Sequence, residues 1–150
     1  MKAVWQRVDF ASVEVEGKTI SKISKGALVL LGVEKDDNEK DAKYIADKIC
    51  NLRVFDDEDG KLNKSLIDIS GELLIVSQFT LCADCRKGRR PSFINALKGK
   101  EAENLYLKVV ELCKGLNIKK VETGIFGAHM KISLLNNGPV TLLLDSRRKF

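Results

Sequence analysis

The sequence has a single histidine, His129, and no long hydrophobic segment. A Ser–His–acid triad would have to use that histidine. A zinc site needs three or four ligands close together, and a single histidine with four scattered cysteines does not suggest such a group. The longest apolar runs, residues 27–31 and 73–76, are far too short to cross a bilayer. The first residues also lack the pattern of a signal peptide. We therefore expect a soluble, cytoplasmic protein that has no metal site and does not associate with membranes.

Sequence signatures of bound cofactors are also missing. There is neither a GxGxxG nor a Walker sequence, so no cofactor is predicted. Residues 56–59 are all acidic, but the ligand spacing of a calcium loop is absent, and a solvated turn is predicted. Cys82 and Cys85 form one CxxC, which leaves a redox pair or half of a zinc site open as an alternative. Cys50 and Cys113 occupy apolar positions of helical patterns and are predicted to lie in the core.

Proline is also scarce, with two residues in 150, and disorder is not expected beyond the ends. Hydrophobic residues make up 44% and charged residues 31%, which suits one globular domain over residues 1–150. The net charge is +5, and it is concentrated in two segments, residues 86–90 and the tail 146–150. Each segment is either simply solvated or contacts phosphate groups of a polyanion.

The hydrophobic pattern predicts a mixed sheet with flanking helices. A buried strand is expected at residues 27–33, with a second at 73–79. Further strands are expected at 4–8, 12–16 and 19–23, and at 129–135 and 140–145 around a turn at 136–139. One helix follows a cap at Asp36 or Asp37 and presents Ala42, Ile45, Ile49 and Leu52. A second covers 100–116, presents Ala102, Leu105, Val109, Leu112 and Leu116, and stops near Gly115; a short third is expected at 91–97. This order implies a single α/β domain.

Two polar segments at strand ends are candidates for a functional site. Hydroxyls, an amide and free backbone N–H groups at Ser77, Gln78, Phe79 and Thr80 could surround a reacting carbonyl and stabilise an oxyanion. Ordinary turn hydrogen bonds are the alternative, and the residues alone favour it. The second segment, 137–141, contains Gly138-Pro139, which is either a hairpin corner or a cis dipeptide. In the cis form its carbonyls could bind an ammonium group.

These two segments resemble the signature motifs of the D-aminoacyl-tRNA deacylases, also called D-tyrosyl-tRNA deacylases. The motifs read Ser77-Gln78-Phe79-Thr80-Leu81 and Asn137-Gly138-Pro139-Val140-Thr141. The likeness extends over nearly the whole chain through shorter segments: Gln6-Arg7-Val8, Ala11-Ser12-Val13, Leu30-Leu31-Gly32-Val33 and Arg90-Pro91-Ser92-Phe93. Either motif alone is weak, whereas both together in this order and at this chain length are specific.

The resemblance implies an obligate homodimer with a barrel-like mixed sheet and an active site at the dimer interface. Ser77, Gln78, Phe79 and Thr80 would form the catalytic wall. Gly138-Pro139 would enter from the partner subunit as a cis dipeptide, capture the amino group of the substrate and reject L-side chains. The remaining substrate-binding residues implied by the family are Asn137, Thr141, Phe126, Met130 and Arg7, with Arg7 bracing the Gly-Pro segment.

The implied function is chiral proofreading in translation, by hydrolysis of D-aminoacyl-tRNA and of mischarged glycyl-tRNA. The nucleic-acid partner is then the aminoacylated 3′ end of tRNA and not DNA, and no metal or other cofactor takes part. A nucleophilic Thr80 needs a base, and the chain offers few. Assistance by the terminal ribose 2′-hydroxyl of the tRNA is therefore preferred.

Three other functions stay open at this stage. One is a non-catalytic tRNA-binding module on the same fold. A second is a deacylase for mischarged L-alanine, for which relatives are thought to carry a different dipeptide with a trans bond. The third is a thiol protein that uses Cys82 and Cys85.

Overall fold

The computed structural model describes residues 1–149, so Phe150, the last residue of the basic tail, lies outside the described residues. No helix in residues 1–149 has both the length and the apolar character needed to span a membrane. The elements follow in this order: β1 (Lys2–Val15), β2 (Lys18–Ile23), β3 (Gly26–Gly32), α1 (Glu39–Asn51), β4 (Phe55–Asp56), β5 (Leu62–Lys64), β6 (Glu72–Ser77), the 3₁₀ turn η1 (Phe79–Cys82), α2 (Gly99–Lys114), β7 (Lys120–Thr123) and β8 (Lys131–Asp145).

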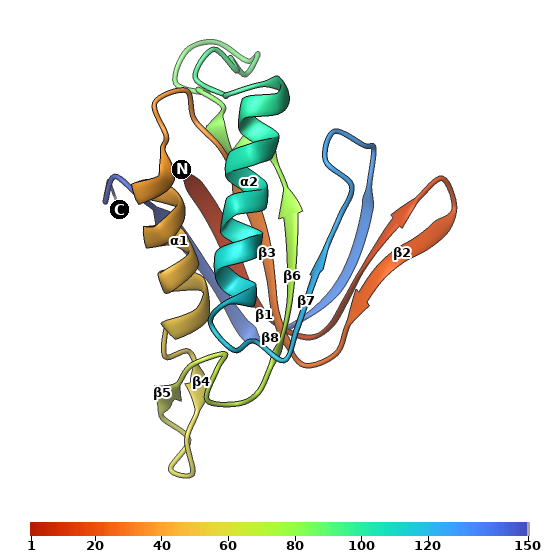
Figure 1. Cartoon of the computed structure of the whole chain (residues 1–150), viewed down its shortest axis with the longest axis vertical. Helices are drawn as coiled ribbons and strands as arrows, with labels where there is room; N and C mark the ends of the chain where they lie inside the picture. Colours follow the sequence, from red (N-terminus) through yellow and green to blue (C-terminus); the bar gives the residue numbers. More distant parts are fainter. Residues whose placement is uncertain (150) are drawn as a thin grey trace.

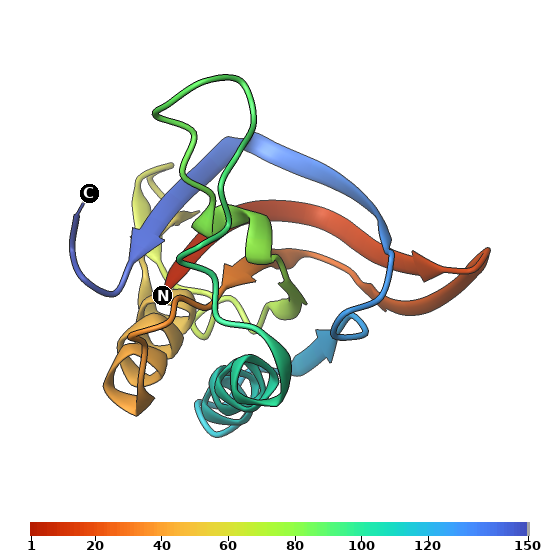
Figure 2. The ribbon, with the colours of Figure 1, turned by 90° about the horizontal axis from the view of Figure 1, so that it is seen from above.

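The main sheet is mixed and strongly curved, as the sequence predicts. Its strand order is β2-β1-β3-β6-β7, and β8 also pairs with β1. β3, β6 and β7 run parallel, whereas β1 is antiparallel to β2, β3 and β8. The long strands β1 and β8 bend together, which nearly closes the sheet into a barrel (Figure 2). The chain is therefore a single α/β domain with a barrel-like core.

The central strands β3 and β6 are apolar on both faces because each face meets a different core. α1 and α2 lie side by side over one face (Figure 1), where they bury Trp5, Val29 and Ile75. The opposite face is lined by the curved part of β1, β2 and β8, where Val8, Leu28 and Leu74 are buried. Continuous burial of residues 26–29 and 73–76 agrees with the predicted fully covered strands.

Both long helices form where the apolar periodicity predicts them. In α1, Ala42, Ile45 and Ile49 are buried as expected, and in α2 the helix ends at the predicted Gly115. The buried face of α2 is rotated from the prediction, because Tyr106 and Cys113 are buried while the three leucines of the predicted face, Leu105, Leu112 and Leu116, are only partly covered. Cys50 and Cys113 are both fully buried, as predicted for core positions.

The predicted hairpin corner at residues 136–139 is wrong, since β8 runs without interruption from Lys131 to Asp145. Pro139 has no N–H to offer the sheet, but the Asn136 side chain compensates: it accepts from Val140 N at 3.0 Å and donates to Val140 O at 3.3 Å. β1 accommodates the irregularity through register shifts between Gln6 and Val8 and between Val8 and Ala11. With these register shifts β1 continues as one bulged strand, where the sequence predicts two strands at 4–8 and 12–16.

Three smaller predictions are also corrected. Residues 91–97 form no helix, because their backbone groups bond to other segments: Leu97 N donates to Val33 O, and Asn95 O accepts from Lys35 N. The cap of α1 is Asn38, with Asp41 completing a capping box, and not Asp36 or Asp37. The second buried strand ends at Ser77, and the chain turns into η1 at Phe79.

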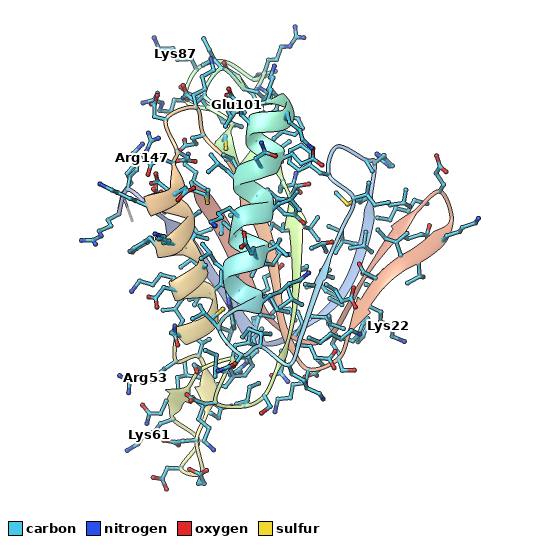
Figure 3. The ribbon with its side chains drawn as sticks, viewed as in Figure 1. Lys22, Arg53, Lys61, Lys87, Glu101 and Arg147 are labelled. Carbon is cyan, nitrogen blue, oxygen red and sulfur yellow. The ribbon has the colours of Figure 1, made fainter. Side chains whose placement is uncertain are left out.

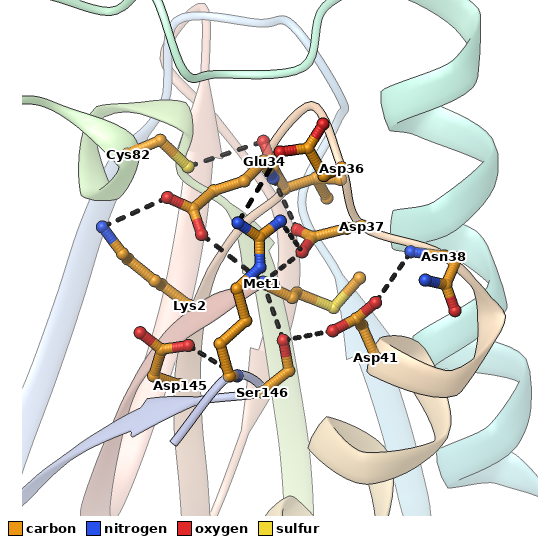
Figure 4. A network of polar contacts seen from close by, with 12 residues as sticks. Met1, Lys2, Glu34, Asp36, Asp37, Asn38, Asp41, Cys82, Asp145 and Ser146 are labelled. Atoms are coloured by element: carbon orange, nitrogen blue, oxygen red, sulfur yellow. Dashed lines mark hydrogen bonds and ion pairs between the residues drawn. The ribbon is translucent and has the colours of Figure 1, made fainter. Parts of the chain in front are cut away.

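A buried polar network joins the start of β1, the segment before α1 and the end of β8 (Figure 4). The Met1 ammonium contacts Asp37 and lies 3.7 Å from Glu34, while Arg147 reaches Asp37 at 3.3 Å. Burial acts to raise the pKa of Glu34, but the neighbouring positive charges, chiefly Lys2 at 3.3 Å, outweigh it and the pKa is lowered. Asp37 is therefore occupied with charge pairing, which explains why it does not cap α1.

Candidate functional site

A cavity of about 390 Å³ opens where β6 ends. Its walls come from the end of β6 with η1, from the start of α2, and from residues 126–132. Ser77, Gln78 and Phe79 line it from one side, and Phe126 and Met130 from another. The structure thus brings together five of the residues that the sequence proposes for the site. They come from two segments about 50 positions apart, a separation that a parallel crossover with its helix and loops can span.

The wall formed by η1 is held against β3 by close backbone contact. Gln78 N donates to Leu31 O at 2.8 Å, and a side chain at Gly32 would meet Gln78 O at 2.9 Å. The first N–H groups of a helical turn have no partner inside the turn, and no side chain caps η1. The N–H groups of Phe79 and Thr80 therefore have no partner in the turn, and of these two residues only Phe79 lines the cavity.

Thr80 stands apart from the other residues of its motif. It is exposed and does not line the cavity, and its hydroxyl accepts a hydrogen bond from Gln78 Nε2. Within residues 1–149 no histidine or carboxylate forms a hydrogen bond with Thr80. Its hydroxyl therefore lacks the partner that a nucleophile requires.

The cavity wall at residues 126–130 rests on α2. The Phe126 ring packs on the Tyr106 ring at 5.7 Å between centroids, and the Tyr106 hydroxyl donates to Ile75 O at 2.7 Å. Burial raises the pKa of Tyr106 well above its usual range, so this hydroxyl remains a donor. The contact fixes Phe126 relative to β6, which also carries the opposite wall.

His129 lines the cavity as well, although the sequence presents it only as an exposed polar residue. Its position between Phe126 and Met130 is the signal that could have indicated this. None of the described residues that line the cavity is Asp or Glu, and its charged or titratable members are Lys98 and His129. In the described part of the chain no three His, Cys, Asp or Glu residues are grouped to hold a metal ion. The cavity thus favours an anionic or neutral ligand.

Gly138 and Pro139 lie elsewhere, on the exposed side of β8, and do not line the cavity of their own chain. The bond between them is cis. Arg7 lies beside this segment and donates to Asn137 O at 3.0 Å and to Val54 O at 2.9 Å. Thr141 Oγ1 accepts from Asn136 Nδ2 at 2.9 Å. The candidate residues therefore form two separate groups in one chain.

The CxxC segment does not form a paired site. Cys82 is buried, its thiol donates to Val33 O at 3.5 Å, and Cys85 is exposed; both are free thiols. Burial raises the pKa of Cys82 to about 11, which disfavours the thiolate that redox chemistry needs.

Fold and site together describe a single-domain α/β protein with a largely apolar cavity at a strand end, where Ser77, Gln78, Lys98 and His129 supply the polar side chains. The model of the family described as D-Tyr-tRNA(Tyr) deacylase matches residues 4–145. The D-aminoacyl-tRNA deacylase of Thermosipho africanus is 65% identical over 150 residues, which is all of both chains.

Solved structures share the fold of the chain. A structure named c-Myc DNA Unwinding Element Binding Protein has a TM-score of 0.92 at 44% identity and covers 97% of this chain and 98% of its own. A probable eukaryotic D-amino acid tRNA deacylase shares the fold, with a TM-score of 0.81 at 16% identity over 95% of this chain and 97% of its own. The chain belongs to the D-Tyr-tRNA(Tyr) deacylase family. Its relatives are named D-aminoacyl-tRNA deacylases, which are hydrolases that act on the ester bond of an aminoacyl-tRNA.

Proposed function

We propose that this protein hydrolyses the ester bond between a D-amino acid and tRNA, and that it also accepts glycyl-tRNA. The observation that carries the proposal is the cavity at η1, where unpaired N–H groups adjoin a pocket without carboxylates. Such N–H groups stabilise the oxyanion that forms when an ester carbonyl is attacked. The family membership of the chain supports the same reaction.

In the proposed mechanism the protein positions the ester and the tRNA supplies the activating group. The terminal ribose 2′-hydroxyl assists the attack of a water molecule on the carbonyl carbon, and the N–H group of Phe79 stabilises the negative charge on the carbonyl oxygen. The bond to the ribose 3′-oxygen then breaks, and this oxygen takes up the proton that the water has lost. Gln78 and Ser77 orient the ester, and Phe126 and Met130 bound the pocket. This assignment agrees with the absence of Asp and Glu from the cavity wall, since no side-chain base is required.

Selection of the D-form is assigned to a second copy of the chain. Gly138 and Pro139 are exposed and lie outside their own cavity, which leaves them accessible to the cavity of a second copy. The faces of β1 and β8 around them carry the exposed apolar side chains Phe10, Leu135 and Leu143, a surface suited to association. In the homodimer the carbonyls of this segment bind the substrate ammonium, and its backbone excludes an L-side chain. Asn137, Thr141 and Arg7 hold the segment in place.

The direct test is hydrolysis of matched D-Tyr-tRNA and L-Tyr-tRNA by the purified protein, with a chelator present. We expect rapid loss of the D-ester and no measurable loss of the L-ester, because only the L-side chain meets the Gly-Pro backbone. Equal hydrolysis of both esters would contradict the stereochemical proposal. Hydrolysis of neither ester together with tight tRNA binding would indicate a binding module, and preference for L-Ala-tRNA would indicate the other deacylase class.

The role of Thr80 leads to a second prediction. Thr80→Ala should retain activity within about tenfold of the wild type, because the hydroxyl lies outside the cavity and is not activated by a base. Thr80→Val, which keeps the shape of the side chain, serves as the matched control. Single-turnover hydrolysis of D-Tyr-tRNA is the measurement. A loss as complete as that of an essential nucleophile, in both variants, would restore Thr80 as the attacking group.

A further inference from the structure

The loop that follows η1 is a projecting arch closed at its base. Asp84 and Ser92 exchange two backbone hydrogen bonds, of 2.8 and 3.0 Å, which pin the two legs together. Residues 85–91 form the tip, and Figure 1 shows this loop extending beyond the end of the sheet at the top of the view. We name residues 84–92 the basic arch.

The basic arch carries more positive charge than its own carboxylate neutralises. Arg86 holds Asp84 through two side-chain hydrogen bonds of 2.9 and 2.7 Å, and this contact keeps the pKa of Asp84 well below its usual range. Lys87, Arg89 and Arg90 are exposed and form no ion pair with any residue from 1 to 149. Three cations are thus left to face solvent at the tip.

The base of the arch adjoins the cavity. Phe93, the residue after Ser92, packs edge-on against Phe79 with ring centroids 5.0 Å apart, and Phe79 lines the cavity. Lys98, farther along the same segment, lies at the cavity wall. A ligand that occupies the cavity and continues outward can therefore pass from Lys98 and Phe79 to the cations of the arch.

The other basic segment, the C-terminal tail, differs because its arginines are engaged within the protein. Arg147 pairs with Asp36 and Asp37 at 3.8 and 3.3 Å, and the Arg148 guanidinium lies over the Tyr44 ring at 5.4 Å. These contacts attach the tail to α1 and to the network before it. Of the two basic segments that the sequence offers for phosphate contact, only the arch presents several unpaired cations.

We propose that the basic arch binds phosphate groups of the tRNA strand whose 3′ end enters the cavity. This inference rests on the proposed function, because it identifies the tRNA as the ligand. Arginine matches phosphate oxygens with two parallel hydrogen bonds, and each neutralised phosphate releases counterions. The arch gives the protein affinity for tRNA, and the cavity determines which ester is cleaved.

The test is the salt dependence of binding to deacylated tRNA. The variant Lys87→Ala/Arg89→Ala/Arg90→Ala is compared with Lys18→Ala/Lys22→Ala/Lys25→Ala, which removes the same charge from β2 and the turn that follows it. Lys87 lies at the top of the molecule and Lys22 on its lower right side (Figure 3), so the control preserves the arch. We expect the arch variant to bind tRNA at least about tenfold more weakly than the wild type. The magnitude of its slope of log K against log salt should fall by about 2. The control variant should keep the wild-type slope.

Hydrolysis of a D-tyrosyl ester of adenosine, which has no phosphate, separates this inference from the proposed function. The arch variant should cleave it at the wild-type rate while its KM for D-Tyr-tRNA rises. If the wild type cleaves neither ester, the proposed function fails, and the salt slopes still decide the role of the arch. Three outcomes would overturn the inference. The salt slope of the arch variant could stay unchanged, or it could fall equally in both variants. The slope could also fall for binding to a DNA duplex but not for binding to tRNA.

Discussion

Gly138→Ala is expected to lower kcat/KM for D-Tyr-tRNA by about 100-fold. Gly138 has φ of +127°, where an L-residue is strained, and an added Cβ would lie 2.8 Å from Val140 Cγ2 and 3.0 Å from Arg7 Nη2. The carbonyls of the segment must then move, and a displacement of about 1 Å from a productive geometry costs on the order of 100-fold in rate. Steady-state hydrolysis with the purified variant measures the effect.

Gly60→Ala is the matched control for Gly138→Ala. Gly60 also has positive φ, at +73°, but it lies in the turn between β4 and β5, and nothing within 4 Å would contact its Cβ. This variant should lose about 1 kcal/mol of stability through backbone strain and retain full activity. Wild-type activity in Gly138→Ala, with the dimer intact by light scattering, would remove Gly138-Pro139 from the substrate site.

Gly32→Ala is expected to reduce activity strongly through the wall that carries Gln78. An added Cβ would lie 2.9 Å from Gln78 O, 3.0 Å from Cys82 Sγ and 3.1 Å from Leu81 Cβ, so η1 must shift away from β3. We expect a loss of about 1–3 kcal/mol in the free energy of unfolding from overpacking. We also expect a fall of about 100-fold in kcat, because the N–H groups of η1 move with the turn.

Gly115→Ala is the control for the glycine-to-alanine replacement itself. Gly115 ends α2 with φ of −72°, and its Cβ would meet only Leu112 O at 3.4 Å and Glu111 O at 3.7 Å, so stability and rate should stay near those of the wild type. Activity is compared well below each variant's unfolding temperature, which separates the rate effect from the stability effect. A destabilised Gly32→Ala variant with unchanged kcat would show that the position of η1 does not control the reaction.

The parts of the fold that could be predicted are those decided by local periodicity. Apolar runs and repeats of three and four give β3, β6, α1 and α2 directly, because burial follows the period of each element. The sequence predicts the two halves of β8 as strands, but their continuity through residues 136–139 could not be predicted, since Asn-Asn-Gly-Pro is a turn signal by itself. Only pairing with a bulged β1 and the Asn136 side chain keep it extended. The short strand β7 and the extended leg at residues 91–97 likewise depend on partners distant in sequence.

For the candidate site, the sequence proposes residues but not their spatial grouping. Motif residues Ser77, Gln78 and Phe79 meet Phe126 and Met130 at one cavity, as the resemblance implies. The position of Thr80 outside the cavity and the presence of His129 within it depend on how η1 and the segment before β8 turn. Neither turn has a period or composition that specifies side-chain direction. The pairing of Arg147 with Asp36 and Asp37 could not be predicted either, because it joins residues about 110 positions apart in the sequence.

The double pairing of β1 connects the two groups of site residues through backbone alone. Ser77 is paired with Leu31, Leu31 with Ala3, and Ala3 with Leu144 on the strand that carries Gly138-Pro139. Within one chain, the separation between the cavity and the dipeptide is therefore fixed by strand spacing. Substitutions among the pocket side chains can change which amino acids fit without altering that separation, so handedness and side-chain preference can evolve independently in such a protein.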